Sequence, residues 1–442
     1  MSELSLEEKR ELARRLLRQK QAESVKPETS PSYTDFMSGT DRTLSEVRSF
    51  SSWISQAKAQ KPFSLERTRL TTAEASARYT GAPDRELINL STYNYLGLSA
   101  HPRVVEAARA AIERYGIGSG ASPIASGKLE IHEQLEQELL CYFDRPNSGV
   151  TLYSAGYNVN TGSISALMRP GTHLVLDSLV HASIEEGAKL SGATVHTFRH
   201  NDVEDLSRVL KSLLAEKSRV MVCTEGVFSA DGDFGKVAEI ADTAKRYGAL
   251  LLVDEAHSTL LCGPKGRGVA AAQGVLEKVD LLVITFSKGF GGIGGALVAD
   301  RAIADYVNWY SRSRLFSCAI SPGVTAGVLE ALRLASGPEG DERRNKLQNN
   351  ADFLRNALNG KVATGESTSW VVPVIFGAES MSVELLEYLR ASGLEATAME
   401  FPGVPRGEAR LRLFVTSEHT ETQLERAAEV VLAAARRFGF HL

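Results

Sequence analysis

The stretch Asp280-Leu-Leu-Val-Ile-Thr-Phe-Ser-Lys288-Gly-Phe-Gly-Gly-Ile-Gly-Gly-Ala296 is the most informative part of this chain. It begins with a short apolar run of the length of a buried strand, which leads to two hydroxyls, Thr285 and Ser287, and then to a single lysine. The glycines that follow let the backbone come close to a bulky group. Hydroxyls and free backbone N–H groups suit a phosphate, whereas Lys288 suits an electrophilic carbonyl.

A phosphate and a carbonyl on one small molecule indicate pyridoxal 5'-phosphate (PLP), with Lys288 as the residue that forms a Schiff base with it. The alternative is a solvated lysine in a glycine-rich surface turn, because lysine is almost never buried without a partner. This stretch leaves both interpretations open, so independent support has to come from the rest of the chain.

The composition is typical of a globular enzyme. The 442 residues suffice for two or three domains, with 43% hydrophobic and 24% charged residues. A net charge of −4 argues against nucleic acid or an anionic membrane as partner. Four widely spaced cysteines indicate reduced thiols, and no apolar run approaches the roughly 20 residues of a membrane span. We expect a cytoplasmic protein without a metal site or a secretory signal.

Changes of pattern along the chain divide it into four parts. The expected parts are an N-terminal helical arm and linker that is a candidate docking segment (1–60), an N-terminal segment of the catalytic unit (61–100), a large PLP-binding domain (101–320) and a small C-terminal α+β domain (321–442). Within the first part, helices are expected at 4–23 and 44–60, and a strand at 86–90 precedes the large domain.

Helices alternate with short apolar strands from residue 102 onward, which predicts an α/β fold with a mainly parallel sheet covered on both faces. Helices are expected at 102–115, 129–143, 157–168, 182–191, 202–216 and 235–247. Strands are expected at 150–153, 173–177, 194–198, 219–224, 249–254, 280–285 and 295–299. In the smaller unit, helices are expected near 340–358, 382–392 and 420–437, and strands near 370–376 and 410–415.

The sequence Leu250-Leu-Leu-Val-Asp254-Glu-Ala-His257 places an acid and a histidine at the end of a buried strand, where open α/β sheets bind ligands. Asp254 there can pair with a protonated pyridine nitrogen, and His257 can hydrogen-bond a phenolic oxygen. The alternative is an aspartate that only caps a helix. A nucleotide triphosphatase is disfavoured because no phosphate-binding GxxxxGK[ST] loop precedes this acidic motif.

Two further strand ends carry polar groups. Ser154, Gly156 and Tyr157 follow the strand at 150–153, and free N–H groups at the start of the next helix would form a second phosphate cradle. His181 follows the next strand and could stack on an aromatic ring. Both features also have ordinary explanations: strand–turn–helix units are common in α/β proteins, and the histidine could simply bond its local backbone.

Two more segments offer contacts to a ligand. Ser229 follows another strand and could contact a ring oxygen or belong to a local turn. Arg410 and Arg412 alternate on one face of a strand, so one of them could hold a substrate carboxylate in bidentate fashion. The alternative for the arginines is a solubilising role at an exposed edge.

Taken together and in this order, the motifs resemble the α-oxoamine synthases, PLP enzymes of fold type I, the aspartate-aminotransferase-like group. The resemblance extends from about Asn89 to the C-terminus. It is carried by YSAGYN, LDSLVHASI, GVFSADG, LLLVDEAHS, TFSKGFGG, RLFSCAISP and PRGEARLR. It implies a large PLP-binding domain, a smaller C-terminal domain and a homodimer with shared active sites.

The resemblance also implies a role for each motif residue. Lys288 corresponds to the Schiff-base lysine, Asp254 to the partner of the pyridine nitrogen, and His181 to the stacking histidine, and these three are the expected catalytic residues. The expected cofactor contacts are Ser154, Gly156, Tyr157, His181, Ser229, Asp254, His257, Thr285, Ser287, Lys288 and, from the other subunit, Ser317. Arg412 and Asn94 are expected to bind substrate.

The sequence departs from the family at two places. The segment Ser91-Thr-Tyr93-Asn94-Tyr95-Leu-Gly97 differs from the usual SNxYLG, and Pro123 stands where many relatives carry arginine. The second departure leaves recognition of the acyl donor open.

The family implies a decarboxylative condensation of a small amino acid with an acyl thioester to give an α-aminoketone. The alternatives are an aminotransferase of the same fold and a non-catalytic subunit of a heteromeric synthase. Residues 4–23 resemble helices at module junctions of polyketide and nonribosomal peptide synthases, so the acyl donor is expected to be either a coenzyme A (CoA) ester or a carrier protein. The identity of the amino acid and the length of the acyl chain stay open.

Overall fold

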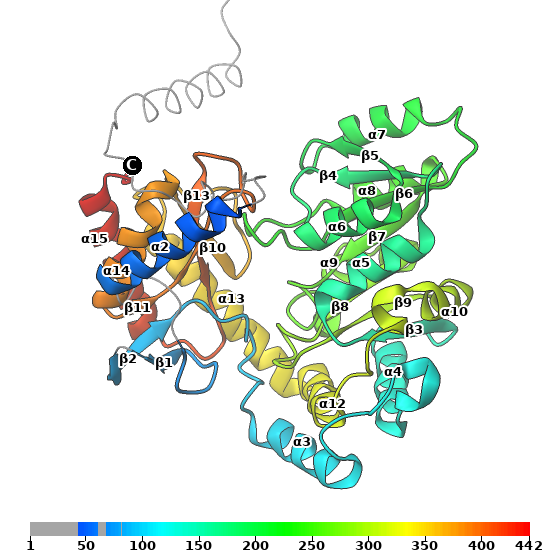
Figure 1. The fold of residues 1–442 in the computed structure, drawn as a ribbon, viewed down its shortest axis with the longest axis horizontal. Helices are drawn as coiled ribbons and strands as arrows, with labels where there is room; N and C mark the ends of the chain where they lie inside the picture. Colours follow the sequence, from blue (N-terminus) through cyan, green and yellow to red (C-terminus); the bar gives the residue numbers. More distant parts are fainter. Residues whose placement is uncertain (1–42, 61–67, 81) are drawn as a thin grey trace, which may run out of the picture.

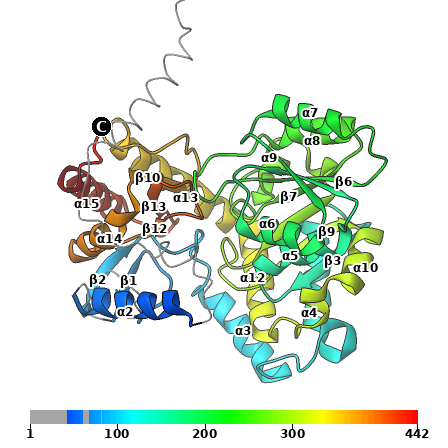
Figure 2. The same ribbon diagram turned by 45° about the horizontal axis from the view of Figure 1, so that its top comes forward.

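The computed structural model describes residues 43–60, 68–80 and 82–442. The expected helix at 4–23 and almost all of the linker after it lie outside the described residues. The described chain forms two lobes, one built around a large sheet and one around two small sheets (Figures 1 and 2).

The large lobe contains a seven-stranded sheet with the strand order β3-β9-β8-β7-β6-β4-β5 (Figure 1). Its strands are β3 (Ser148–Tyr153), β4 (His173–Asp177), β5 (Thr194–Phe198), β6 (Val220–Glu225), β7 (Leu250–Asp254), β8 (Leu281–Thr285) and β9 (Gly295–Asp300). Only β9 pairs antiparallel, with β3 and with β8, and the other neighbours are parallel. The predicted mainly parallel sheet is confirmed.

Helices cover both faces of this sheet because its strands are apolar on both sides. Along β8, Leu281 and Val283 pack into one hydrophobic cluster, whereas Leu282 and Ile284 pack into the other. The helices of this lobe are α3 (Pro102–Tyr115), α4 (Glu130–Tyr142), α5 (Gly156–Leu167), α6 (Ala182–Ser191), α7 (Val203–Ser212), α8 (Val237–Arg246), α9 (Val269–Ala272), α10 (Arg301–Tyr310), α11 (Arg312–Leu315) and α12 (Pro322–Ser336). The side chains of α5, α6 and α10 fill the cluster that contains Leu281.

The small lobe combines the two ends of the described chain (Figure 2). Its strands are β1 (Ser76–Tyr79), β2 (Ala82–Asn89), β10 (Val371–Gly377), β11 (Leu394–Glu395), β12 (Thr397–Met399) and β13 (Ala409–Phe414), and its helices are α2 (Ser45–Gln60), α13 (Pro338–Leu358), α14 (Ser382–Ala391) and α15 (Glu421–Phe438). One sheet has the order β10-β13-β12 and the other β1-β2-β11. The parallel pairing of Ile88 with Leu394 therefore joins the N-terminal segment to the C-terminal lobe.

Within the described residues, the predicted elements agree with the structure apart from shifts at their ends. The helix expected at 202–216 ends at Ser212. The sequence patterns did not predict α10, α12 or the short strands β1, β11 and β12. Most of α12 is buried, so it lacks the polar face by which an amphipathic helix is usually found.

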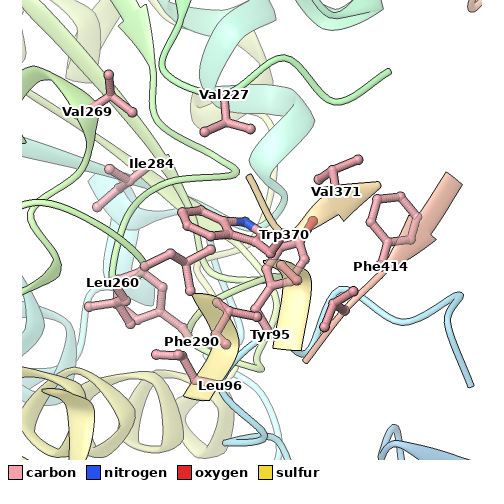
Figure 3. Close-up of a cluster of buried hydrophobic side chains, with 14 of the residues drawn as sticks. Tyr95, Leu96, Val227, Leu260, Val269, Ile284, Phe290, Trp370, Val371 and Phe414 are labelled. Carbon is pink, nitrogen blue, oxygen red and sulfur yellow. The ribbon is translucent and has the colours of Figure 1, made fainter. Parts of the chain in front are cut away.

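An aromatic cluster lies where the lobes meet, and Figure 3 shows its side chains. Tyr95 comes from the segment before α3, Trp370 directly precedes β10, and Phe414 ends β13. The ring centres of Trp370 and Phe414 lie 6.2 and 6.3 Å from that of Tyr95. None of the described helices is both long and apolar enough to span a membrane.

Candidate active site

A cavity of about 270 Å³ lies at the carboxyl ends of β6, β7 and β8, and Arg412 and Met399 of the small lobe complete its wall. It is lined by Tyr93, Gly156, Tyr157, Asn160, His181, Ser183, Glu225, Ser229, Asp254, Ala256, His257, Val283, Thr285, Ser287, Lys288, Met399 and Arg412. The motifs singled out in the sequence, far apart along the chain, therefore converge on one cavity.

Lys288 enters this cavity from the turn after β8. In the part of the chain that the structure describes, its amine makes no hydrogen bond or ion pair, and Nζ lies 6.0 Å from the centre of the Tyr93 ring. Burial lowers the pKa of Lys288 to about 8, although the nearby carboxylates of Asp254 and Glu225 oppose this shift. A lysine of this kind supplies a nucleophilic amine near neutral pH.

Asp254 faces the same cavity from the end of β7 and is 5% exposed. Its Oδ2 accepts a hydrogen bond of 2.6 Å from Asn160 Nδ2, and its Oδ1 accepts one of 2.9 Å from the backbone N–H of Ala256. The segment after Asp254 consists of turns and not of an α-helix, so helix capping does not account for this residue. The two hydrogen bonds fix the orientation of this carboxyl group at the cavity, where an acid suits a protonated ring nitrogen.

His181 is the N-cap residue of α6. Its Nδ1 accepts a hydrogen bond of 3.2 Å from Ser183 N and lies 2.8 Å from Ser183 Oγ, which in turn accepts a bond of 2.9 Å from Asn160 Nδ2. Burial and the charge of Lys288 lower the pKa of His181, so its ring is neutral at neutral pH. Asn160 thus connects His181, through Ser183, with Asp254.

His257 is held from two sides within the aromatic cluster. Its Nδ1 lies 2.8 Å from the hydroxyl of Tyr95, and its carbonyl oxygen accepts a hydrogen bond of 3.0 Å from Trp370 Nε1. Burial, followed by the charge of Lys288, keeps the pKa of His257 well below its usual value. The ring therefore faces the cavity as a neutral imidazole.

The start of α5 has the geometry of a cradle for an anion. Its N-cap, Ala155, provides no side-chain hydrogen bond, and Gly156 and Tyr157 line the cavity directly after it. A Cβ atom on Gly156 would lie only 2.1 Å from Thr285 Oγ1, so the close approach of helix and strand requires glycine. The Thr285 and Ser287 hydroxyls lie 3.1 Å apart beside this helix end, which suits a phosphate group.

Of the two arginines on β13, Arg410 is paired with acids, whereas Arg412 keeps hydrogen-bond donors available for a ligand. Arg410 is 2% exposed and is paired with Asp231 and Glu408. Arg412 makes one long hydrogen bond, 3.4 Å to Ser229 O, and its buried Nε has no partner among the described residues. Because β13 is the central strand of its sheet, the solubilising role considered for an exposed edge does not apply.

Three predicted site residues do not line this cavity. Ser154 and Ser317 line a separate small pocket. Asn94 is 4% exposed, and its amide is satisfied elsewhere, because Nδ2 donates to Ala73 O at 2.8 Å and to Ser99 Oγ at 2.9 Å. Tyr93, the neighbour of Asn94, lines the cavity in its place.

Several residues at the cavity were not predicted. Asn160 lies one helical turn after Gly156 and thus on the same face of α5, a spacing that could have indicated it. Glu225, which accepts a hydrogen bond from the backbone N–H of His181, is the last residue of β6, at the strand end where ligands bind. Ser183 at the cavity carried no such signal, and neither did Tyr95, which contacts the cavity residue His257.

The cavity fits PLP on three counts. The start of α5 with its two hydroxyls matches the phosphate, Lys288 matches the aldehyde, and Asp254 matches the ring nitrogen. These groups come from the start of α5, the end of β7, and the end of β8 with the turn after it, and all of them line one cavity.

Comparisons with known proteins agree with this geometry. The family model described as aminotransferase class I and II matches residues 85–431. The 8-amino-7-oxononanoate synthase of Thermoanaerobacter pseudethanolicus is 39% identical over 345 residues, which cover 78% of this chain and 86% of that protein. The synthase of the same name from Salmonella paratyphi B is 38% identical over 369 residues, 83% of this chain and 94% of the relative.

Solved structures of serine palmitoyltransferases have the same fold. The enzyme from S. paucimobilis, with a bound PLP–myriocin aldimine, superposes with a TM-score of 0.82 at 31% identity and covers 89% of this chain and 99% of its own. The Sphingomonas wittichii enzyme gives a TM-score of 0.82 at 30% identity, with 91% and 100% covered. The chain belongs to the aminotransferase class I and II family, and within it to the α-oxoamine synthases, which are PLP-dependent acyltransferases.

Proposed function

We propose that the protein condenses a small amino acid with an acyl thioester, with loss of carbon dioxide, to give an α-aminoketone. The observation that carries this proposal is that Lys288, Asp254 and the under-used guanidinium of Arg412 face one cavity. A lysine and an acid serve PLP chemistry, and the arginine supplies a place for the carboxylate of an amino acid.

We assign the cofactor contacts as follows. Lys288 would bind the aldehyde, and Asp254 would keep the ring nitrogen protonated. The N–H groups at Gly156 and Tyr157, with Thr285 and Ser287, would hold the phosphate. When bound, PLP delocalises the negative charge that develops at the substrate α-carbon.

The remaining residues act on the substrate. Arg412 would orient the amino acid by its carboxylate. Once the substrate amino group has displaced Lys288 from the aldehyde, the freed Lys288 amine, with its lowered pKa, would take the proton from the α-carbon. That carbon then attacks the thioester carbonyl and the thiol leaves. Loss of the carboxylate as carbon dioxide and return of a proton give the aminoketone. His181, a neutral ring on the cavity wall, would stack on the cofactor and could donate a hydrogen bond to the ketone oxygen.

The test is a product analysis of purified protein supplied with PLP, glycine, alanine or serine, and CoA thioesters of increasing chain length. We expect equal amounts of free thiol and carbon dioxide, and an aminoketone whose mass matches the amino acid and acyl chain supplied. A keto acid formed without thiol release would instead identify an aminotransferase. A protein that binds no PLP would be a non-catalytic subunit.

We further propose a homodimer in which Ser317 completes the active site of the other subunit. Ser317 lies outside the cavity of its own chain, and Trp309, Tyr310 and Phe316 nearby in the sequence are 63%, 61% and 77% exposed. Mixing a Lys288→Ala subunit with a Ser317→Trp subunit tests this. If the active sites are shared, the mixed dimers should be more active than either variant alone. Activity equal to the sum of the residual activities of the two variants would contradict shared sites.

The nature of the acyl carrier is a separate proposal. The resemblance of residues 4–23 to helices of assembly-line enzymes favours a carrier-protein donor. Deletion of residues 1–45 should then reduce activity with an acyl-carrier protein but not with acyl-CoA, and equal activity with both donors would count against it.

The four cysteines are free thiols, which fits a reducing cytoplasm.

A further inference from the structure

Tyr95 is a buried tyrosine whose hydroxyl reaches the active site from behind. Its side chain is 0% exposed and packs among Trp370, Phe414 and Leu96 in the cluster of Figure 3. Within the described residues, the hydroxyl has one hydrogen-bond partner, His257 Nδ1, at 2.8 Å. His257 is thus in contact with Tyr95 on one side and with the cavity on the other.

The direction of this hydrogen bond follows from the surroundings. Burial raises the pKa of Tyr95 well above its usual value, so the phenol keeps its proton. If His257 Nδ1 carried a hydrogen, the phenol would accept it and its own O–H would point into an apolar cluster without an acceptor. An unmade hydrogen bond of a buried hydroxyl is costly, so the satisfied arrangement has Tyr95 as donor and Nδ1 as acceptor.

The other ring nitrogen then carries the hydrogen. Burial and the charge of Lys288 keep His257 neutral, and a neutral imidazole has a single N–H. With Nδ1 engaged as an acceptor, that hydrogen is on Nε2. Trp370 Nε1 donates to the carbonyl oxygen of His257 at 3.0 Å and fixes the backbone that bears the ring.

We propose that Tyr95 is a positioning residue that holds His257 in its Nε2–H tautomer, so that the imidazole offers the ligand a hydrogen-bond donor. The identity of the ligand atom that accepts this hydrogen bond, the phenolic oxygen of the cofactor, rests on the proposed function. The tautomer of His257 does not depend on it. A donor at this oxygen stabilises its ionised form. Loss of the donor should therefore raise the pH at which the visible band of the bound cofactor titrates.

The tautomer of His257 can be determined directly by NMR in cofactor-free protein labelled with ¹⁵N at histidine. Long-range ¹H–¹⁵N spectra distinguish the two tautomers, and the signal lost in His257→Gln identifies His257 among the nine histidines. Wild-type protein should show the Nε2–H tautomer, and Tyr95→Phe should show a mixture or the Nδ1–H form. Tyr142→Phe is the matched control, because Tyr142 is also buried and donates to one acceptor, Lys265 O at 3.0 Å.

A second readout uses the bound cofactor. Tyr95→Phe should shift the titration midpoint of the visible band upward by roughly one pH unit, the size expected for one hydrogen bond to a charged group. In a His257→Gln background the same change should have no further effect. An Nδ1–H tautomer in the wild type, or an unchanged Nε2–H signal in Tyr95→Phe, would overturn the proposal. Because the wild-type spectrum needs neither the variant nor turnover, it decides the tautomer even if Tyr95→Phe folds poorly or no aminoketone forms.

Discussion

Asn160 donates a hydrogen bond of 2.6 Å to Asp254 Oδ2 and, from the same amide nitrogen, one of 2.9 Å to Ser183 Oγ. Helix α5, whose start is the proposed phosphate cradle, is thereby joined to the acid at the end of β7. All three side chains are buried, so the orientation of Asp254 depends on an amide that the sequence motifs did not indicate.

Replacing Asn160 should therefore impair catalysis without abolishing folding. Asn160→Ala removes a hydrogen bond to a charged group, worth about 1.5–3 kcal/mol, so we expect kcat to fall roughly 10- to 100-fold. Ser165→Ala is the control, because its hydroxyl bonds only within α5. Steady-state kinetics check this, and equal kcat values for the two variants would show that Asn160 does not support Asp254.

The two arginines of β13 should give different phenotypes. Arg412→Ala should raise KM for the amino acid roughly 10- to 100-fold, since it removes charged hydrogen bonds to the substrate carboxylate. Arg410→Ala should mainly lower the Tm, because it leaves Asp231 without its partner. Kinetics and thermal unfolding of both variants separate the two roles. A KM effect confined to Arg410→Ala would contradict the assignment.

Attachment of PLP to the cofactor-free protein should depend on pH with a midpoint near 8. Only the uncharged amine of Lys288 attacks the aldehyde, and its pKa is lowered to about 8, so the rate should rise with pH through that value. An unperturbed lysine would titrate near pH 10.4. Asp254→Asn removes a carboxylate that raises the lysine pKa, so its midpoint should be lower. Stopped-flow absorbance measures both, and a wild-type midpoint above 10 would refute the perturbed lysine.

His200, which does not line the cavity, should make the stability of the protein depend on pH. It lies between Asp177 and Asp233 at 2.9 and 2.8 Å. Burial alone would lower the pKa of His200, but the two carboxylates raise it to about 10. A folded-state pKa above the unfolded value of about 6.5 stabilises the protein fully below pH 6.5, and this is lost as the pH rises through 10.

Urea unfolding of wild type and His200→Gln tests this contribution. At pH 6.5 the free energy of unfolding should be higher for wild type than for His200→Gln. This difference should shrink as the pH approaches 10. A difference that grows with pH would mean that the histidine is not held in its charged form.

The sequence predicted the sheet and most of the cavity because both depend on local patterns. Most of the strands are short apolar runs, and several end in a polar residue, as Leu250–Asp254 and Leu281–Thr285 do. Parallel strands bring such ends together. Helix α12 was not predicted because it is buried on nearly all sides and shows little contrast between faces.

The positioning residues could not be predicted because their partners are distant in the chain. Tyr95 meets His257 across 162 residues, and Asn160 meets Asp254 across 94. Asn94, by contrast, was expected at the substrate, but its amide is used to hold the chain at Ala73 and Ser99. No local pattern distinguishes it from Tyr93, the neighbour that lines the cavity.

The role of Lys288 is tested most directly by comparing wild type with Lys288→Ala in the presence of PLP, amino acid and acyl thioester. Wild type should show the visible band of a covalently held cofactor and release thiol, carbon dioxide and aminoketone in equal amounts. Lys288→Ala should lack this covalent attachment and form no measurable aminoketone. Aminoketone formation by Lys288→Ala at the wild-type rate would contradict the assignment of Lys288 as the residue that carries the reaction.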